Sequence, residues 1–192
     1  MDPIEQLAQL FAEARLAPCH DPTAMTLSTV GGDGRPSARV VLLKGVDGDG
    51  LVFYTNTRSR KGRELAANPN VALTLWWPAI GWQVRVEGRA SPVGDQEADA
   101  YFATRARGSQ LGAWASEQSE ELGSRAELEA RLAAVTARFA GQPVTRPPHW
   151  SGYRVTPLLV ELWKNREDRL HEREQFVRPS ATAPWSRRLL QP

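Results

Sequence analysis

The chain has 192 residues, of which 41% are hydrophobic and 24% charged, and it is therefore long enough for one globular domain with a sizeable core. Its 24 Lys and Arg against 22 Asp and Glu leave a net charge of +2, which argues against a nucleic-acid-binding module because such proteins gather basic residues into a large patch. The single cysteine, Cys19, excludes an intramolecular disulfide and a cysteine-rich metal site, so no metal is expected. We see no membrane span and no signal peptide, and we expect a cytoplasmic protein.

In chain order, the pattern begins with a helix and continues with short strands. Apolar residues from Ile4 to Phe11 recur at helical spacing, which predicts an N-terminal helix over residues 1–17. Gly- and Asp-rich turns then separate β-branched and apolar runs, a pattern typical of an antiparallel meander or barrel. The predicted strands cover residues 24–30, 37–44 and 51–55, and a short helix follows over 59–68.

The second half of the chain alternates strands and helices and contains no internal repeat. The predicted strands cover residues 71–77, 83–90, 153–163, 169–178 and 185–190. The predicted helices cover residues 95–104 and 124–139, and a Pro-rich connector covers 142–149. We interpret residues 1–192 as one mainly β (α+β) domain with peripheral helices, in which residues 169–192 form the C-terminal strands.

The run Arg169-Leu170-His171-Glu172-Arg173 is the most informative local feature. On a β-strand, its alternate residues Arg169, His171 and Arg173 would point to one face. Like charges placed this way repel one another unless an anion lies opposite them. The alternative is a solvated edge strand whose charges prevent aggregation.

Two further clusters are suited to an anion such as phosphate. Ser59-Arg60-Lys61-Gly62 begins the short helix, where cations and backbone N–H groups can meet an anion. Tyr101, Arg105 and Ser109 follow one another at i, i+4 and i+8 spacing and offer a phenol, a guanidinium and a hydroxyl. The alternatives are exposed helix cations in the first cluster and an ordinary amphipathic helix end in the second.

Taken together, these pieces resemble the pyridoxine (pyridoxamine) 5′-phosphate oxidase family along nearly the whole chain. Eight blocks carry the resemblance in order: Asp21-Pro22-Thr23-Ala24-Met25, Arg39-Val40-Val41-Leu42-Leu43-Lys44, Phe53-Tyr54-Thr55-Asn56, Ser59-Arg60-Lys61-Gly62, Gln83-Val84-Arg85, Ser109-Gln110-Leu111-Gly112-Ala113-Trp114, Gln118-Ser119 and Arg169-Leu170-His171-Glu172-Arg173. The resemblance implies a split β-barrel FMN-binding fold, an antiparallel Greek-key-like barrel that forms a homodimer with FMN at the subunit interface.

The resemblance also implies the roles of individual residues. The residues expected to bind FMN are Arg39, Val40, Val41, Leu42, Leu43, Lys44, Tyr54, Thr55, Arg60, Lys61, Gln83, Gln118, Ser119, Trp163 and Arg173. The residues expected to hold the substrate phosphate are Lys44, Tyr101, Arg105 and Ser109, and Asp21 is a further substrate-binding candidate. Arg169 and His171 are expected to lie against the substrate ring and its reactive side as the catalytic pair.

The implied activity is FMN-dependent oxidation of pyridoxine 5′-phosphate and pyridoxamine 5′-phosphate to pyridoxal 5′-phosphate, in vitamin B6 biosynthesis and salvage. A hydride would pass from C4′ to flavin N5, and O2 would reoxidise the flavin to give H2O2. One alternative is a phenazine-biosynthesis-type FMN oxidase, which the predicted phosphate site disfavours. The other is a non-catalytic flavin or pyridoxal-phosphate binding protein, which the pair Arg169 and His171 disfavours.

Three features depart from the family pattern. The chain starts at about the Asp-Pro that follows an N-terminal arm in the family, so we expect the Arg and Tyr of that lid to be missing. Trp82 stands where many members have Arg before the Gln-Val pair, and Trp163-Lys164-Asn165-Arg166 replaces a Gln-Gly pattern after the Trp. We therefore expect a different loop before Arg169.

Overall fold

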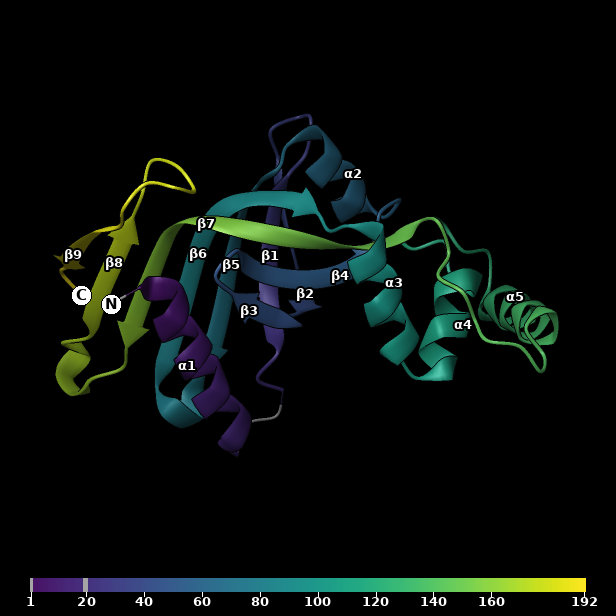
Figure 1. Ribbon diagram of the computed structural model, residues 1–192, viewed down its shortest axis with the longest axis horizontal. Helices are drawn as coiled ribbons and strands as arrows, with labels where there is room; N and C mark the ends of the chain where they lie inside the picture. The colour runs from purple at the N-terminus through teal and green to yellow at the C-terminus, as the bar shows by residue number, and fades with distance from the viewer. Residues whose placement is uncertain (1, 19–20) are drawn as a thin grey trace.

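A computed structural model describes residues 2–18 and 21–192 (Figure 1). Cys19 lies outside the described residues. Within the described chain the α-helices are α1 (Pro3–Leu16), α2 (Arg60–Ala67), α3 (Asp95–Thr104), α4 (Arg107–Ala115) and α5 (Arg125–Arg138), and the 3-10 helices are η1 (Pro78–Ile80) and η2 (Glu167–Arg169). The strands are β1 (Ala24–Val30), β2 (Pro36–Leu42), β3 (Gly45–Asp47), β4 (Gly50–Asn56), β5 (Asn70–Trp77), β6 (Trp82–Pro92), β7 (Trp150–Lys164), β8 (Glu172–Val177) and β9 (Ser186–Leu190).

The strands form one curled antiparallel sheet in the order β2-β1-β5-β6-β7-β4-β3, and β8 pairs with β7 and β9. The long strand β7 pairs with β6 along one edge. Its other edge pairs first with β4, from Trp150 to Val155, and then with β8, from Leu159 to Lys164. Figure 1 shows β7 crossing the molecule between these two partners. The predicted mainly β, split-barrel fold is therefore confirmed.

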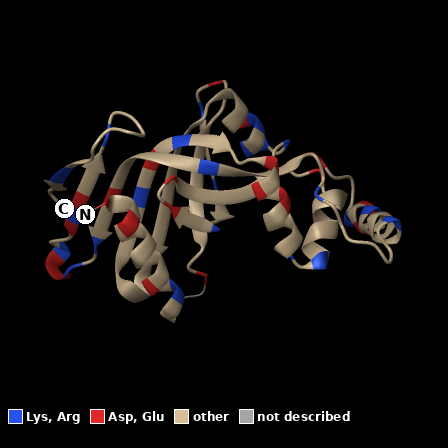
Figure 2. Ribbon diagram, in the orientation of Figure 1, with Lys and Arg blue, Asp and Glu red and all other residues tan. Residues whose placement is uncertain are grey.

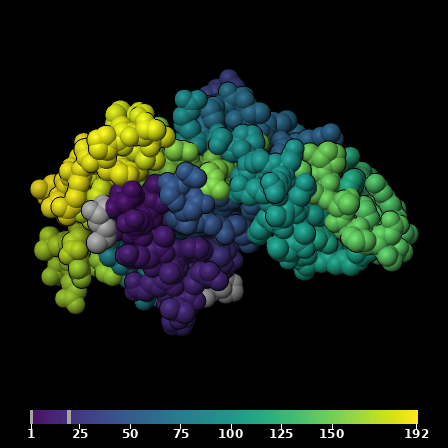
Figure 3. Space-filling model, viewed as in Figure 1, coloured from purple at the N-terminus to yellow at the C-terminus, as the bar shows by residue number. Residues whose placement is uncertain are grey.

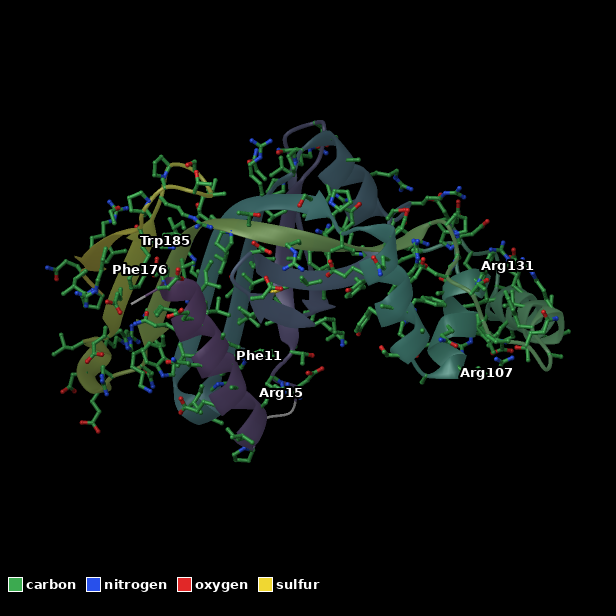
Figure 4. The ribbon with its side chains drawn as sticks, viewed as in Figure 1. Phe11, Arg15, Arg107, Arg131, Phe176 and Trp185 are labelled. Carbon is green, nitrogen blue, oxygen red and sulfur yellow. The ribbon has the colours of Figure 1, made fainter. Side chains whose placement is uncertain are left out.

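The core follows from strand alternation. In β5, Val71, Leu73, Leu75 and Trp77 are buried at every second position, because successive side chains of a strand point to opposite faces. Helix α1 covers one end of this core. Its Phe11 ring stacks on Trp77 with centroids 6.1 Å apart, near Arg15 (Figure 4). Burial of this apolar surface supplies the main driving force for the fold.

A smaller apolar cluster lies at the other end of the molecule, which we call the helical end and define by α3, α4 and α5 (Figure 1). It contains Phe102, Leu111, Phe139, Val144 and Trp150. We call the opposite end, formed by η2, β8 and β9, the β8 end. Figure 4 shows Arg107 and Arg131 at the helical end and Phe176 and Trp185 at the β8 end.

The observed elements depart most from the predicted ones at three places. The strand predicted over residues 37–44 ends at Leu42, and the chain makes a separate short strand, β3, that pairs with β4. Helix α4 was not predicted. The strand predicted to begin at Arg169 begins at Glu172, because Asp168 and Arg169 have φ values of 54° and 60° and form a turn.

Positively and negatively charged residues are mixed along the ribbon, and neither end carries residues of only one charge sign (Figure 2). In residues 2–18 and 21–192, no helix has the length and apolar character that crossing a membrane requires.

Candidate active site

A cavity of about 410 Å³ opens between the helical end and the sheet. Its lining includes Lys44, Tyr101, Arg105 and Ser109, the four residues predicted to hold a phosphate. The spacing of Tyr101, Arg105 and Ser109 suggested one helix, but these three residues do not share one. Tyr101 belongs to α3 and Ser109 to α4, while Arg105 is non-helical between them with φ −71° and ψ 147°. The bend between the two helices therefore brings the phenol, the guanidinium and the hydroxyl to one cavity.

Arg105 is held by aromatic rings. Its Cζ atom lies 4.7 Å from the ring centroid of Trp150 and 5.6 Å from that of Phe102. Its Nη1 atom is buried and has no hydrogen-bond partner in the described part of the chain. Burial lowers the pKa of the guanidinium, and the nearby Tyr101 phenol opposes that shift. Because an arginine stays protonated in proteins, the cavity contains a cation with an unused donor.

The rings of Tyr54, Tyr101 and Trp150, which line the same cavity as Arg105, lie with nearly parallel planes in what we call the aromatic cluster. The Tyr54 centroid lies 4.0 Å from that of Tyr101 and 5.3 Å from that of Trp150, and the Tyr101 and Trp150 centroids are 6.2 Å apart. Gly152 leaves room for the Tyr54 ring, because a Cβ atom at this position would lie 2.7 Å from Cε1 of Tyr54. Burial, reinforced by Glu97, raises the pKa of Tyr54 to about 12, so the phenol remains protonated at neutral pH.

Lys61 lies at the wall of the same cavity, in a cluster of predicted cofactor-binding residues. Its Nζ atom donates to Gln118 Oε1 at 2.9 Å and to Thr55 Oγ1 at 3.2 Å. Burial, and then the neighbouring Arg39, lower the pKa of the Lys61 ammonium, while Glu64 opposes the shift. Lys61, Thr55 and Gln118 all line the 410 Å³ cavity, as do Val40, Val41, Leu42 and Tyr54 from the same predicted set.

Arg39 and Arg60 share one carboxylate. Glu64 accepts from Arg39 Nη2 at 3.1 Å and from Arg60 Nε at 2.8 Å, and Thr29 and Ser37 also donate to it. Burial opposes ionisation of Glu64, but the hydrogen bonds from Thr29, Ser37, Arg60 and Arg39 outweigh it and lower its pKa to about 2. Sequence reasoning missed Glu64, although its i, i+4 spacing from Arg60 was a usable signal.

At the β8 end, three predicted cofactor-binding residues lie in one row across neighbouring strands. Gln83 of β6 pairs with Trp163 of β7, which pairs with Arg173 of β8. Arg173 Nε donates to Glu161 at 2.9 Å, and this carboxylate, only 2% exposed, also accepts from Arg85 and Gln175. Glu161 is a second carboxylate that sequence reasoning missed.

The prediction that Arg169, His171 and Arg173 alternate on one strand is wrong. Arg169 ends η2 in a left-handed conformation, and His171 precedes β8. The His171 ring instead packs against Trp163 with centroids 4.3 Å apart, and its Nδ1 atom accepts from the backbone N–H of Arg166 at 3.2 Å. The turn, rather than strand alternation, therefore decides where Arg169 and His171 lie.

Two of the predicted site residues, Asp21 and Ser119, lie in turns or loops. Asp21 accepts from the backbone N–H of Thr23 at 2.9 Å and shapes the turn before β1. Ser119 has φ 75° and lies next to Gln118 in the loop after α4.

The predicted site residues thus fall into two groups within one chain. Lys44, Tyr101, Arg105, Ser109 and Lys61 lie around the cavity at the helical end, whereas Trp163, His171 and Arg173 lie at the β8 end (Figure 1). Figure 3 shows the two ends, teal to green and yellow-green to yellow, on opposite sides of the molecule. A single chain does not bring the two groups together.

The fold belongs to a known class. A pyridoxamine 5′-phosphate oxidase-related, FMN binding protein from Nostoc punctiforme PCC 73102 matches with a TM-score of 0.79 at 18% identity, covering 100% of this chain and 99% of that one. PhzG from Burkholderia lata 383, solved in complex with tetrahydrophenazine-1-carboxylic acid, matches with a TM-score of 0.93 at 36% identity, covering 100% of this chain and 93% of that one. The architecture is that of the FMN-binding split barrels.

Sequence comparison identifies the family within this fold class. The family model for pyridoxamine 5′-phosphate oxidase matches residues 11–139, and the model for the pyridoxine 5′-phosphate oxidase C-terminal dimerisation region matches residues 150–192. Pyridoxine/pyridoxamine 5′-phosphate oxidases of Myxococcus xanthus and Rubrobacter xylanophilus are each 56% identical over 191 residues, covering 100% of this chain and 92% and 87% of theirs. The chain belongs to the pyridoxamine 5′-phosphate oxidase family and is an oxidoreductase of that type.

Proposed function

We propose that this enzyme oxidises pyridoxine 5′-phosphate and pyridoxamine 5′-phosphate to pyridoxal 5′-phosphate with FMN as cofactor and O2 as electron acceptor. The observation that carries the proposal is that Arg105 lines one cavity with Lys44, Tyr101 and Ser109, while its buried Nη1 atom has no hydrogen-bond partner in the described part of the chain. The two relatives named pyridoxine/pyridoxamine 5′-phosphate oxidase support the same substrates.

The four cavity residues suit a phosphomonoester. A phosphate group carries close to two negative charges at neutral pH. Arg105 and Lys44 offer positive charge, and Tyr101 and Ser109 offer neutral O–H donors. Because Arg105 has an unused donor, a bound phosphate would remove the cost of leaving that group unpaired.

The residues around Lys61 fit the phosphate end of FMN. Lys61, Thr55 and Gln118 form one polar cluster at the cavity wall, next to the first turn of α2 and Arg60. Lys44, Tyr54, the β2 residues Arg39 to Leu42 and the following Leu43 would complete this side, together with Ser119. When bound, FMN would supply the hydride acceptor and pass the electrons to O2.

The remaining cofactor-binding residues would come from a second copy of the chain. Gln83, Trp163 and Arg173 lie at the β8 end, away from the Lys61 cluster, and Trp163 and Arg173 fall inside the region that matches the dimerisation model. We therefore infer a homodimer in which one subunit supplies the cavity and its partner supplies the β8 end. Exposed apolar residues on β2, Val40 and Leu42, are suited to such an interface.

His171 and Arg169 would orient the substrate. The ring of His171 lies against Trp163, so it would reach the cavity together with the partner's β8 end. Arg169 projects from an exposed turn in the same loop. Their role would be to hold the pyridine ring so that one C4′–H bond points at the cofactor, since orientation contributes several kcal/mol to such reactions, on the order of 7 to 11 in favourable model systems.

Anaerobic reduction tests this function. The purified protein should be yellow, and pyridoxine 5′-phosphate should bleach the flavin absorbance without air; admission of O2 should restore the colour and release H2O2. Absence of bleaching with both phosphorylated vitamers would overturn the oxidase proposal.

A phenazine-type oxidase is the second candidate, because PhzG matches the fold closely. The ligand in that PhzG structure carries a carboxylic acid and no phosphate. The predicted phosphate site around Arg105 therefore favours a pyridoxine 5′-phosphate oxidase over a phenazine-type oxidase. Stopped-flow measurement of the rate of flavin reduction, with pyridoxine 5′-phosphate and with a reduced phenazine carboxylic acid at equal concentrations, would decide between the two functions. Faster reduction by the phenazine would favour the second candidate.

A further inference from the structure

We infer that Trp150 is a positioning residue for phosphate recognition, because its ring holds the Arg105 guanidinium at the cavity without neutralising its charge. The inference rests on the proposed function of the Arg105 cavity. It assigns to Trp150, which also lines the cavity, a role that acts through its neighbour Arg105.

The support of the Arg105 side chain differs from that of three other arginines in the predicted site, Arg39, Arg60 and Arg173. Arg39 and Arg60 are bonded to Glu64, and Arg173 is bonded to Glu161. In the described part of the chain no carboxylate forms an ion pair with Arg105; the indole face of Trp150 takes that place at 4.7 Å.

This difference matters for a ligand that carries two negative charges. A carboxylate beside Arg105 would orient it but would also repel the phosphate. An aromatic face attracts the cation through its quadrupole and carries no net charge. The ring can therefore orient the guanidinium while leaving its full charge for the ligand.

Trp150 is itself held rigidly. It begins β7, and its backbone N–H donates to the Pro147 carbonyl at 3.0 Å. Its ring stacks on Tyr54 at an interplanar angle of 8° and meets Phe102 edge-on at 70°. Contacts on these sides fix the plane on which Arg105 rests, so the direction of the free Nη1 atom follows from the position of Trp150.

Binding of pyridoxal 5′-phosphate and of unphosphorylated pyridoxal to the FMN-loaded protein, measured by isothermal titration calorimetry, tests the inference. Trp150→Leu should weaken pyridoxal 5′-phosphate binding by about tenfold, the magnitude expected for loss of a partly desolvated cation–π contact. Trp150→Phe, which keeps an aromatic face, should lose only about threefold. Binding of pyridoxal should change in neither variant.

A double-mutant cycle separates positioning from packing. If Trp150 acts through Arg105, Trp150→Phe should have no further effect on pyridoxal 5′-phosphate binding in an Arg105→Gln background. Trp114→Leu is the matched control, because Arg138 lies 4.5 Å over that ring at the same end of the molecule; it should leave binding unchanged. If Trp150→Leu does not fold, as judged by its unfolding transition, the test rests on Trp150→Phe and on its double-mutant cycle with Arg105→Gln.

Equal losses for pyridoxal and pyridoxal 5′-phosphate, or a Trp150 effect that persists without Arg105, would overturn the inference and leave the phosphate site intact. A wild-type protein that binds both ligands equally would instead overturn the proposed phosphate site, and this inference with it.

Discussion

Arg105 at the helical end rests on the ring of Trp150, whereas Arg173 at the β8 end donates to the buried carboxylate of Glu161. Both arginines belong to the predicted site, but only Arg105 keeps a buried donor without a partner in the described chain. Glu161 in turn bonds Arg85 and Gln175, so Arg173 is part of a closed network of strand side chains.

The difference shows how one fold can prepare two cations for different tasks. An arginine with a carboxylate partner presents a hydrogen-bond donor with little net charge, which suits an uncharged ring edge. An arginine on an aromatic face presents its whole charge, which suits a phosphate. The four substitutions below test this comparison in order of decreasing effect.

Glu161→Gln should have the largest effect, because it leaves Arg85 and Arg173 without their shared carboxylate. We expect a loss of about 3 kcal/mol in the free energy of unfolding, as for other broken buried ion pairs, measured by urea denaturation. Glu87→Gln is the control, since it removes only a half-exposed contact with Arg85 at 3.4 Å and should cost about 0.5 kcal/mol. Equal losses would mean that the network does not stabilise the β8 end.

Arg105→Gln should raise KM for pyridoxine 5′-phosphate about 30-fold, which corresponds to about 2 kcal/mol for a charged hydrogen bond. The measurement is steady-state H2O2 release. Arg107→Gln is the control, because that side chain bonds the carbonyls of Phe139 and Gln142 and should affect stability rather than KM. A similar rise in KM for unphosphorylated pyridoxine would contradict a phosphate role for Arg105.

Gly152→Ala should shift the aromatic cluster, because the new Cβ would meet the Tyr54 ring at 2.7 Å and Val93 Cγ2 at 2.9 Å. We expect a loss of about 1.5 kcal/mol in unfolding free energy from overpacking, together with weaker binding of pyridoxal 5′-phosphate. Gly108→Ala in α4, where nothing lies within 4 Å of the added carbon, should be neutral or stabilising. An unchanged affinity in Gly152→Ala would show that ligand binding by Arg105 does not depend on the aromatic cluster.

Glu64→Gln should have the smallest effect, about 1 kcal/mol in unfolding free energy at neutral pH. Since the folded pKa of Glu64 is lowered from 4.5 to about 2, the contribution of the ionised carboxylate is complete above pH 4.5 and is lost as the pH falls toward 2. Urea denaturation of wild type and variant between pH 7 and 2.5 should therefore show a difference that shrinks on acidification.

A difference between wild type and Glu64→Gln that stays constant over this range would contradict the charge role of Glu64. Glu129→Gln, which removes an exposed ion pair with Arg125 on α5, should change the unfolding free energy little at any pH.

Much of the fold could be predicted because the relevant signals are local. The alternation in residues 24–30 and 71–77 predicted β1 and β5, and the helical spacing of apolar residues within 124–139 predicted α5. Helix α4 was missed because Gly108 and Gly112 weaken its helical pattern. The turn at Asp168 and Arg169 was missed because left-handed φ values at these residue types leave only a weak trace in the sequence.

The sequence by itself determined the fold class, the family and the types of side chain available for an anion, since strand periodicity and short motifs depend on neighbouring residues. Only the tertiary structure decided which partner each cation has. Trp150 lies 45 positions after Arg105, and Glu161 meets Arg173 because β7 and β8 pair in one register. Contacts of this kind depend on strand register and on packing between distant segments, and no local pattern encodes them.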